Sequence, residues 1–541
     1  MSAESGKPSW LVMVYMAGDN NLTEDMVLAL KELLAEGPPE GDTVAAQLDP
    51  HGAGLATARF DLQQGKSLDD CRDRDPGEIN TGNVRSLVSF VEWAVGKHKA
   101  RHPDDWQVTR YLLVLSGHGS GVTEDFFMRD ESSRDSLTLD ELKRALGQVR
   151  SVIDEKMERK LDILGLDACF MAMGELAYEV RDHVDILVGA EGLEPEFGWP
   201  YHRVLAAAKR IVSDTGPMES TDLAKLIVEE YIDHYRDYDR TAGRSVDLSA
   251  IALDRMPNLA AAVSGLAGLL RSQPDQKQVL LAHWYAQTYK SDQFVDLKDF
   301  CRRLQVEFPG PTEEETSNTK AEDLKDKYPV WYSTERQVIA ALDEMVLQSG
   351  CSGFACQYSH GLSVYFPWAV VSPDYTNLAF AREAGWQAFL DPHLQETQRL
   401  PRFKGAAHCY CRKDKELQVL LDLELVRLRA TAPDMKPEIL DRIVRPACEL
   451  GIPEDDVPNE VARRLAKVTG HRYSDNSKYS DNSKYSDNSK YSDNSKRSTS
   501  DRELAVKNLP PVIGAEFSRP RLERRQSVAR ATAVGAAYQN A

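Results

Sequence analysis

The sequence predicts an α/β fold with a mainly parallel sheet flanked by helices, a more helical second half and a C-terminal accessory region. Three observations lead to this class. Short, continuously apolar segments recur through the first 200 residues, as expected for strands that are buried on both faces. Segments with helical spacing separate them, and strands that alternate with helices favour parallel pairing. At 541 residues, the chain is also too long for one ordinary core.

The expected elements follow one another in a regular order. In the first 200 residues, the expected strands are 10–17, 43–48, 111–115, 161–166 and 185–189. The expected helices are 23–34, 84–95, one that opens at the capping box 138–141, and 171–180. Residues 200–400 are more helical but retain two strand-like pieces, 246–253 and 361–366. This alternation predicts that several strands end at one common edge of the sheet.

The composition disfavours some classes of protein. The chain holds 85 acidic and 66 basic side chains, which argues against a nucleic-acid coat, because such a protein needs a basic face. No apolar run is long enough to span a membrane, and residues 1–10 lack the layout of a signal peptide. The eight cysteines have no framework spacing, so we expect reduced thiols and a cytoplasmic protein.

Reactive side chains follow two of the expected strands. LLVLSGHGSG places His118 between small residues, and LDILGLDACF places Cys169 where a strand is expected to give way to a helix. A thiol at a helix N-terminus has a stabilised thiolate, and a nearby imidazole can protonate a leaving amine. The N–H groups of Cys169 and Gly119 are the predicted oxyanion donors. A single Cys or His is more often structural, but this paired arrangement favours a cysteine hydrolase.

These residues resemble the clostripain family of cysteine peptidases, which are relatives of caspases. SGHG and LDACFMAMGELAYE are similar to its two central motifs. Other similar segments are VYMAGDNNL, LTLDELKRAL, GAEGLEPEFGWPY, FVDLKDF, GLSVYFP and WQAFL. The resemblance covers residues 10–395 and implies a caspase-like sheet with a dyad of His118 and Cys169.

The resemblance also implies protein or peptide substrates with a basic residue, mainly Arg, before the scissile bond (the P1 position). The family's acidic residue two before the cysteine corresponds to Asp167, and a guanidinium entering a pocket needs such a carboxylate. A helix N-cap is the alternative role for Asp167. Glu191 follows the next strand and is predicted to line the same cleft. Gly192 and Leu193 depart from the expectation of a second acidic or polar residue there.

Relatives are processed between the His and Cys motifs, and this chain has two candidate self-cleavage sites there. Arg129 and Arg134 lie in a polar segment beside small residues, and exposed loops of this kind are where proteolysis concentrates. The alternative is that these arginines pair with neighbouring acidic side chains, namely Asp130, Glu131 and Asp135.

The thiol chemistry requires no cofactor, and no metal is predicted at the catalytic pair. Calcium, which some relatives use, stays open at residues 19–21 and 130–135, although such residues are more typical of turns. His408, Cys409 and Cys411 resemble half of a zinc site, but no second pair follows at suitable spacing.

The predicted organisation has four parts. A peptidase domain at 8–395 precedes an accessory domain of unknown role at 402–470, a disordered repeat linker at 471–496 and a basic tail at 497–541. The linker repeats YSDNSK, which is too polar to bury a core. We expect the C-terminal region to be regulatory and to offer a site for a protein partner. The alternative function is a non-catalytic signalling or nucleic-acid-binding module that uses a helical pair at 439–468. A third possible function is that of an inactive peptidase fold that serves as a scaffold.

Overall fold

The structure is a computed structural model that describes residues 9–399, except 53, 74–75, 123–126, 243–244, 274–275, 290–292, 354–355 and 368–370. The predicted accessory domain, repeat linker, basic tail and 439–468 helical pair lie outside the described residues, as does the half zinc site. Within the described part, no helix is long and apolar enough to cross a membrane.

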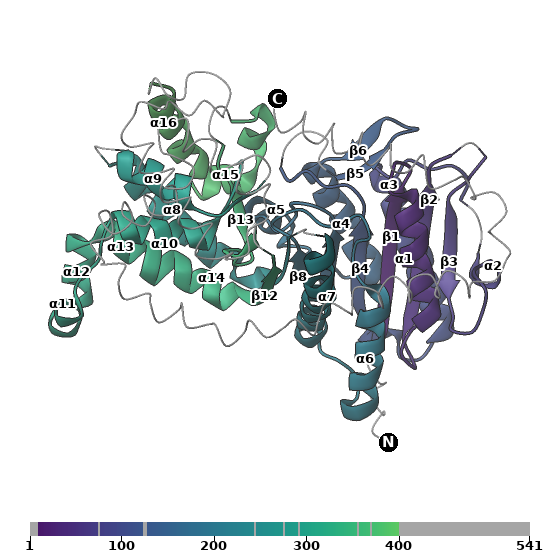
Figure 1. The fold of residues 1–541 in the computed structure, drawn as a ribbon. Coiled ribbons are helices and arrows are strands. Elements are labelled where there is room, and N and C mark those ends of the chain that lie inside the picture. Colours follow the sequence, from purple (N-terminus) through teal and green to yellow (C-terminus); the bar gives the residue numbers. More distant parts are fainter. Residues whose placement is uncertain are drawn as a thin grey trace, which may run out of the picture. The chain divides into compact units, whose positions relative to one another are not determined.

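An eight-stranded sheet forms the centre of this part, in the order β12-β9-β8-β7-β4-β1-β2-β3 (Figure 1). Its strands are β1 (Trp10–Gly18), β2 (Thr43–Pro50), β3 (Ala58–Leu62), β4 (Arg110–Ser116), β7 (Leu161–Asp167), β8 (Val184–Gly189), β9 (Val246–Ala252) and β12 (Val346–Ser352). The run from β8 to β2 pairs in parallel, whereas β3 and β9 run antiparallel to it. This confirms the predicted α/β class with a mainly parallel sheet.

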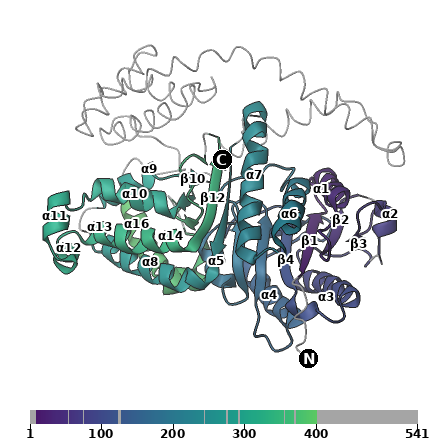
Figure 2. The ribbon, with the colours of Figure 1, turned by 90° about the horizontal axis from the view of Figure 1, so that it is seen from below.

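Helices cover both faces of the sheet (Figure 2). One face carries α1 (Thr23–Glu36), α6 (Tyr201–Thr215) and α7 (Ser220–Ala242), and the other carries α3 (Val84–Arg101), α4 (Leu139–Ile153) and α5 (Gly174–Val180). Successive strand residues point to opposite faces, so Leu11 and Met13 join the apolar cluster of α3 and α4 while Val12 and Val14 join that of α1 and α6. Burial on both faces explains the continuously apolar β1 sequence.

The second half is more helical, as predicted. A small sheet of β10 (Thr288–Tyr289), β11 (Phe294–Asp296) and β13 (Ser363–Tyr365) lies among helices. These are α8 (Met256–Arg271), α9 (Lys277–Tyr285), α10 (Leu297–Glu307), α11 (Glu313–Asn318), α12 (Ala321–Lys327), α13 (Pro329–Ser333), α14 (Ala340–Met345), α15 (Ala379–Glu383) and α16 (Trp386–Arg399). The expected strand at 361–366 is therefore a short strand of a separate sheet. Short elements complete the first half: α2 (Leu68–Cys71), β5 (Phe127–Asp130) and β6 (Asp135–Leu137).

One helix begins later than expected. The helix predicted at 171–180 starts at Gly174, because the chain after β7 first makes an irregular turn. Phe170 has a φ of 61°, and the N–H groups of Met171 and Ala172 both donate to the carbonyl oxygen of Ala190. Backbone groups in this turn thus bond to the chain after β8 instead of starting a helix.

Candidate active site

The two sequence motifs meet because their strands are neighbours. In the parallel pair β4–β7, Ser116 lies opposite Asp167, so the residues that follow both strands emerge at the same edge of the sheet. A Cβ atom added to Gly119 would meet the Cys169 carbonyl oxygen at 2.4 Å, so only glycine fits there. His118 and Cys169 line one pocket with about 550 Å³ of empty space. The structure thus brings together His118, Gly119 and Cys169.

Asn21 orients the imidazole of His118. Its side-chain oxygen Oδ1 lies 2.8 Å from His118 Nε2, so Nε2 donates and Nδ1 keeps its lone pair. Burial is the main cause that lowers the pKa of His118, and the charge of Arg129 acts in the same direction. From the sequence alone, Asn21 is expected only as a calcium ligand or turn former. It lies three residues after the end of β1, which pairs with β4, and this position places it at the same edge of the sheet.

The Cys169 thiol is held against the segment that follows β8. The N–H of Glu194 donates to Sγ at 3.3 Å. Burial raises the pKa of Cys169 to about 11. The expectation of a thiolate at a helix N-terminus is therefore wrong. α5 begins five residues later, at Gly174, and burial of the Cys169 thiol disfavours its charged form. The resting pair is a neutral thiol and a neutral imidazole.

A series of hydrogen bonds holds the turn that carries Cys169 in place. The N–H of Phe170 donates to the Gly192 carbonyl oxygen at 2.9 Å. Asp247, on β9, accepts the N–H of Glu191 at 2.7 Å and that of Gly192 at 3.0 Å. The position of Cys169 thus depends on a carboxylate two strands away in the sheet.

Glu191 is placed differently from the sequence prediction. It is fully buried, it does not line the pocket, and its Oε1 accepts the N–H of Gly361 at 2.7 Å. Burial, followed by the charges of Asp296 and Asp247, raises its pKa. Its geometry is that of a link between the chain after β8 and the second half, not of a residue that lines the cleft.

Asp167 lines the pocket as predicted, but its oxygens already have partners. Oδ2 accepts from Ser116 Oγ at 2.9 Å and from the Tyr201 hydroxyl at 2.7 Å. Oδ1 accepts from the backbone N–H of Trp199 at 3.1 Å. Burial raises its pKa, and a hydrogen bond with Glu194, followed by these three, acts against that rise. The alternative of a helix N-cap is wrong, because no helix begins until Gly174.

Further acidic side chains line the same pocket. Asp25 comes from α1, and Glu194 and Glu196 come from the segment after β8. The second acidic or polar residue expected at 192–193 is instead Glu194, one position further along the chain. The pocket therefore combines a thiol, an imidazole and four carboxyl groups, and its acidic lining suits a cationic group.

The two candidate self-cleavage sites lie on the hairpin of β5 and β6. Arg129 is an exposed residue of β5, and Arg134 has a φ of 52° at the exposed tip. Asp130 accepts the backbone N–H groups of Thr81 and Ser133, at 2.9 and 2.7 Å. The Thr81 bond connects the hairpin to the segment before α3, and the Ser133 bond closes the turn that carries Arg134.

The candidate calcium ligands have protein partners. The Asp19 carboxylate interacts with His51 and accepts the Ser132 N–H at 2.9 Å. In the part of the chain that the structure describes, no group of three or more His, Cys, Asp or Glu side chains is arranged to hold a metal ion.

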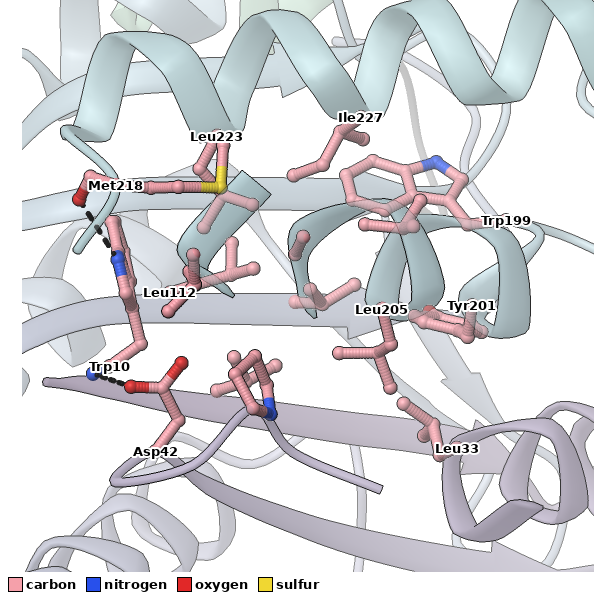
Figure 3. A pocket seen from close by; sticks show the side chains of 16 residues that line it. Trp10, Leu33, Asp42, Leu112, Trp199, Tyr201, Leu205, Met218, Leu223 and Ile227 are labelled. Carbon is pink, nitrogen blue, oxygen red and sulfur yellow. Dashed lines mark hydrogen bonds between the residues drawn. The ribbon is translucent and has the colours of Figure 1, made fainter. Parts of the chain in front are cut away.

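A second pocket is apolar and lies between the sheet, α6 and α7 (Figure 3). Trp10 Nε1 donates to the Met218 carbonyl oxygen at 3.2 Å, and Asp42 accepts the Trp10 N–H at 2.8 Å. Trp199 and Tyr201 line this pocket and also hydrogen-bond to Asp167. The wall between the two pockets therefore positions Asp167.

Comparisons with known proteins agree with the geometry of the site. The sequence model of the clostripain family, Peptidase C11, matches residues 14–392. The chain is 22 % identical over 331 residues to clostripain from Hathewaya histolytica, a match that covers 54 % of this chain and 58 % of that protein. The match thus spans less than two thirds of that relative.

Two solved structures are similar to this chain at 18 % sequence identity. One is a secreted C11 cysteine protease from Bacteroides thetaiotaomicron in complex with an irreversible peptide inhibitor; the match covers 70 % of this chain and 99 % of that chain, with a TM-score of 0.48. The other is an inactive zymogen C11 protease from Parabacteroides distasonis, with 70 % and 98 % covered and a TM-score of 0.46. At these scores, neither likeness adds to the argument.

Proposed function

Since the chain belongs to the clostripain family of peptidases, we propose that it is a cysteine endopeptidase that cleaves after basic residues, with Arg preferred. His118 and Cys169 are its proposed catalytic pair. The observation that carries this proposal is that both residues follow adjacent parallel strands and line one acidic pocket. A neutral thiol beside a neutral imidazole is a competent nucleophile and base.

The proposed reaction starts from this neutral pair. His118 Nδ1 takes the thiol proton as Sγ forms a bond to the substrate carbonyl carbon. The N–H groups of Cys169 and Gly119 donate to the resulting oxyanion. The imidazolium then gives its proton to the leaving amine as the C–N bond breaks. Water, activated by His118, hydrolyses the thioester and restores the thiol.

Substitution of the nucleophile tests this proposal most directly. We expect Cys169→Ala to abolish cleavage of Arg peptides while the protein stays folded, and His118→Ala to lower kcat by about 10³-fold. Cys351→Ser, at a partly exposed free cysteine on β12, is the matched control and should keep full activity. Iodoacetamide should label Cys169 of the wild type. Substantial turnover by Cys169→Ala contradicts the assignment.

Self-processing at the β5–β6 hairpin is part of the proposal. We favour cleavage after Arg134, because the exposed tip must open less than the β5 strand that holds Arg129. A wild-type fragment that begins at Asp135, absent from Cys169→Ala and from Arg134→Ala, supports it. A single uncut and fully active species contradicts any need for processing.

Three broader proposals concern the environment of the protein. We propose a cytoplasmic location, supported by the five described cysteines, all of them free. We propose that activity needs no cofactor, and a chelator titration tests whether calcium contributes.

We also propose that a regulatory protein partner binds the region after residue 401. A pull-down with and without that region tests this. Nucleic-acid binding by 439–468 remains the alternative function.

A further inference from the structure

Asp247 is a buried acidic residue outside the acidic pocket. It lies on β9, is 2 % exposed and is not among the residues that line that pocket. The antiparallel pairing of β8 and β9 ends where Gly189 lies opposite Ser249, and continuing this register by two residues places Asp247 opposite Glu191. There its carboxylate accepts the backbone N–H groups of Glu191 and Gly192. Asp247 thus holds the start of the chain that follows β8.

The chain after β8 in turn supports Cys169 at two places. The turn that follows Cys169 donates three N–H groups to this chain: that of Phe170 to the Gly192 carbonyl oxygen at 2.9 Å, and the next two to the Ala190 carbonyl oxygen, each at 2.8 Å. At the thiol itself, the N–H of Glu194 donates to Sγ at 3.3 Å. A displacement of the chain after β8 therefore moves both the thiol and the backbone of its turn.

We propose that Asp247 is a positioning residue of the peptidase reaction, which fixes the chain after β8 and thereby the Cys169 thiol and the Cys169 N–H that donates to the oxyanion. This inference rests on the proposed function and adds a residue that touches neither substrate nor thiol. It also accounts for Gly192, where a polar side chain was expected. A Cβ atom added to Gly192 would lie 2.6 Å from Asp247 Oδ1, so only glycine fits against this carboxylate.

The two contacts require both oxygens of a carboxylate. The N–H of Glu191 donates to Asp247 Oδ2 at 2.7 Å, and the N–H of Gly192 donates to Oδ1 at 3.0 Å. Burial raises the pKa of Asp247 to about 6, and these two hydrogen bonds, followed by one with the Cys356 thiol, act against that rise. An asparagine has one acceptor oxygen, and its NH₂ group would face the second N–H. Asp247→Asn therefore keeps the size of the side chain but breaks one of the two contacts.

The experiment compares Asp247→Asn with Asp162→Asn in the full chain. Asp162 also accepts a backbone N–H, that of Tyr111 at 2.9 Å, but it lies at the start of β7, at the end of the strand away from Cys169. Cleavage of a fluorogenic Arg peptide is measured per molecule whose Cys169 reacts with iodoacetamide, so that unfolded protein does not count. We expect Asp247→Asn to lower kcat by about 100-fold with little change in KM, because a small misplacement of reacting groups has that effect. Asp162→Asn should keep both values.

Two further measurements address positioning directly. A peptide aldehyde with Arg at P1 forms a thiohemiacetal, in which Sγ bonds to the carbonyl carbon and the oxygen lies where the oxyanion forms. Asp247→Asn should weaken its inhibition about as much as it lowers kcat, because such an analogue uses the transition-state contacts. Gly192→Ala presses on the same carboxylate and should also lower kcat. In the double variant, the two factors should not multiply, because both act through one contact.

The outcomes separate this inference from the proposed function. If the wild type cleaves Arg peptides and folded Asp247→Asn keeps the wild-type kcat, the inference is wrong and the peptidase proposal stands. An equal loss in Asp162→Asn overturns it as well, because the effect is then that of any buried carboxylate. If Asp247→Asn does not fold, a wild-type kcat in folded Gly192→Ala has the same consequence. If the wild type cleaves no peptide, the proposed function fails, and the role of Asp247 fails with it.

Discussion

The two pockets of this protein differ in the groups that line them: one is lined mainly by apolar side chains, and the other by a thiol, an imidazole and four carboxyl groups. In the apolar pocket, Trp10 and Asp42 hydrogen-bond to each other or to the backbone. In the acidic pocket, burial raises the pKa of the Glu194 carboxyl group and of the Cys169 thiol. The first arrangement stabilises a fold, whereas the second costs stability and leaves groups available for chemistry.

Trp199 and Tyr201 connect these two regions. Their side chains line the apolar pocket, while the backbone N–H of Trp199 and the hydroxyl group of Tyr201 donate to the Asp167 carboxylate. Substitutions in the apolar pocket should therefore lower the stability of the fold, and substitutions in the acidic pocket should lower the rate of catalysis. The following changes test that division.

The largest stability effect is expected on the apolar side, at Ile227. This residue is 1 % exposed and lines the apolar pocket from α7. We expect Ile227→Ala to lower the free energy of unfolding by about 2–5 kcal/mol, and the matched Ile227→Val by about 0.5–1.5 kcal/mol. Denaturant unfolding measures both values. If kcat per folded molecule falls as steeply as stability, the two pockets are not separable.

A smaller effect, confined to catalysis, is expected at Asn21. Without its side-chain oxygen, His118 loses the partner that orients Nε2, and we expect Asn21→Ala to lower kcat about tenfold with little change in KM. Asn21→Asp keeps an acceptor and should retain activity, with the acid limb of its pH profile moved to higher pH by the new charge. A change in KM alone would mean that Asn21 acts on binding instead.

The smallest effect concerns pH. Burial lowers the pKa of His118, and the base must be neutral, so activity should be lost only as the pH falls through that lowered value. The acid limb of kcat/KM should therefore lie below about pH 6.5, the ordinary value for histidine. A peptide with citrulline, the neutral isostere of Arg, at P1 is the suitable substrate, because its side chain carries no charge that the carboxyl groups of the pocket could bind. An acid limb well above that value contradicts a buried neutral imidazole.

Much of the fold was predictable because burial on two faces leaves a strong pattern. WLVMVYMA and YLLVL are continuously apolar, and both became central strands, β1 and β4. The start of α5 was not predictable in the same way. Residues 171–173 carry apolar side chains that suit a helix, yet the N–H groups of Met171 and Ala172 donate to the carbonyl oxygen of Ala190, a partner that only the folded sheet provides.

The sequence by itself determined that His118 and Cys169 each follow a buried strand, and that Asp167 lies two residues before the thiol. Only the tertiary structure decided what each carboxyl group contacts. Asp167 has three donors around it, Glu191 accepts from the Gly361 N–H, and Glu194 lies beside Asp167 in the pocket. The physical reason is that a residue type specifies its acceptor atoms, whereas the donors that occupy them come from strands and loops distant in the chain.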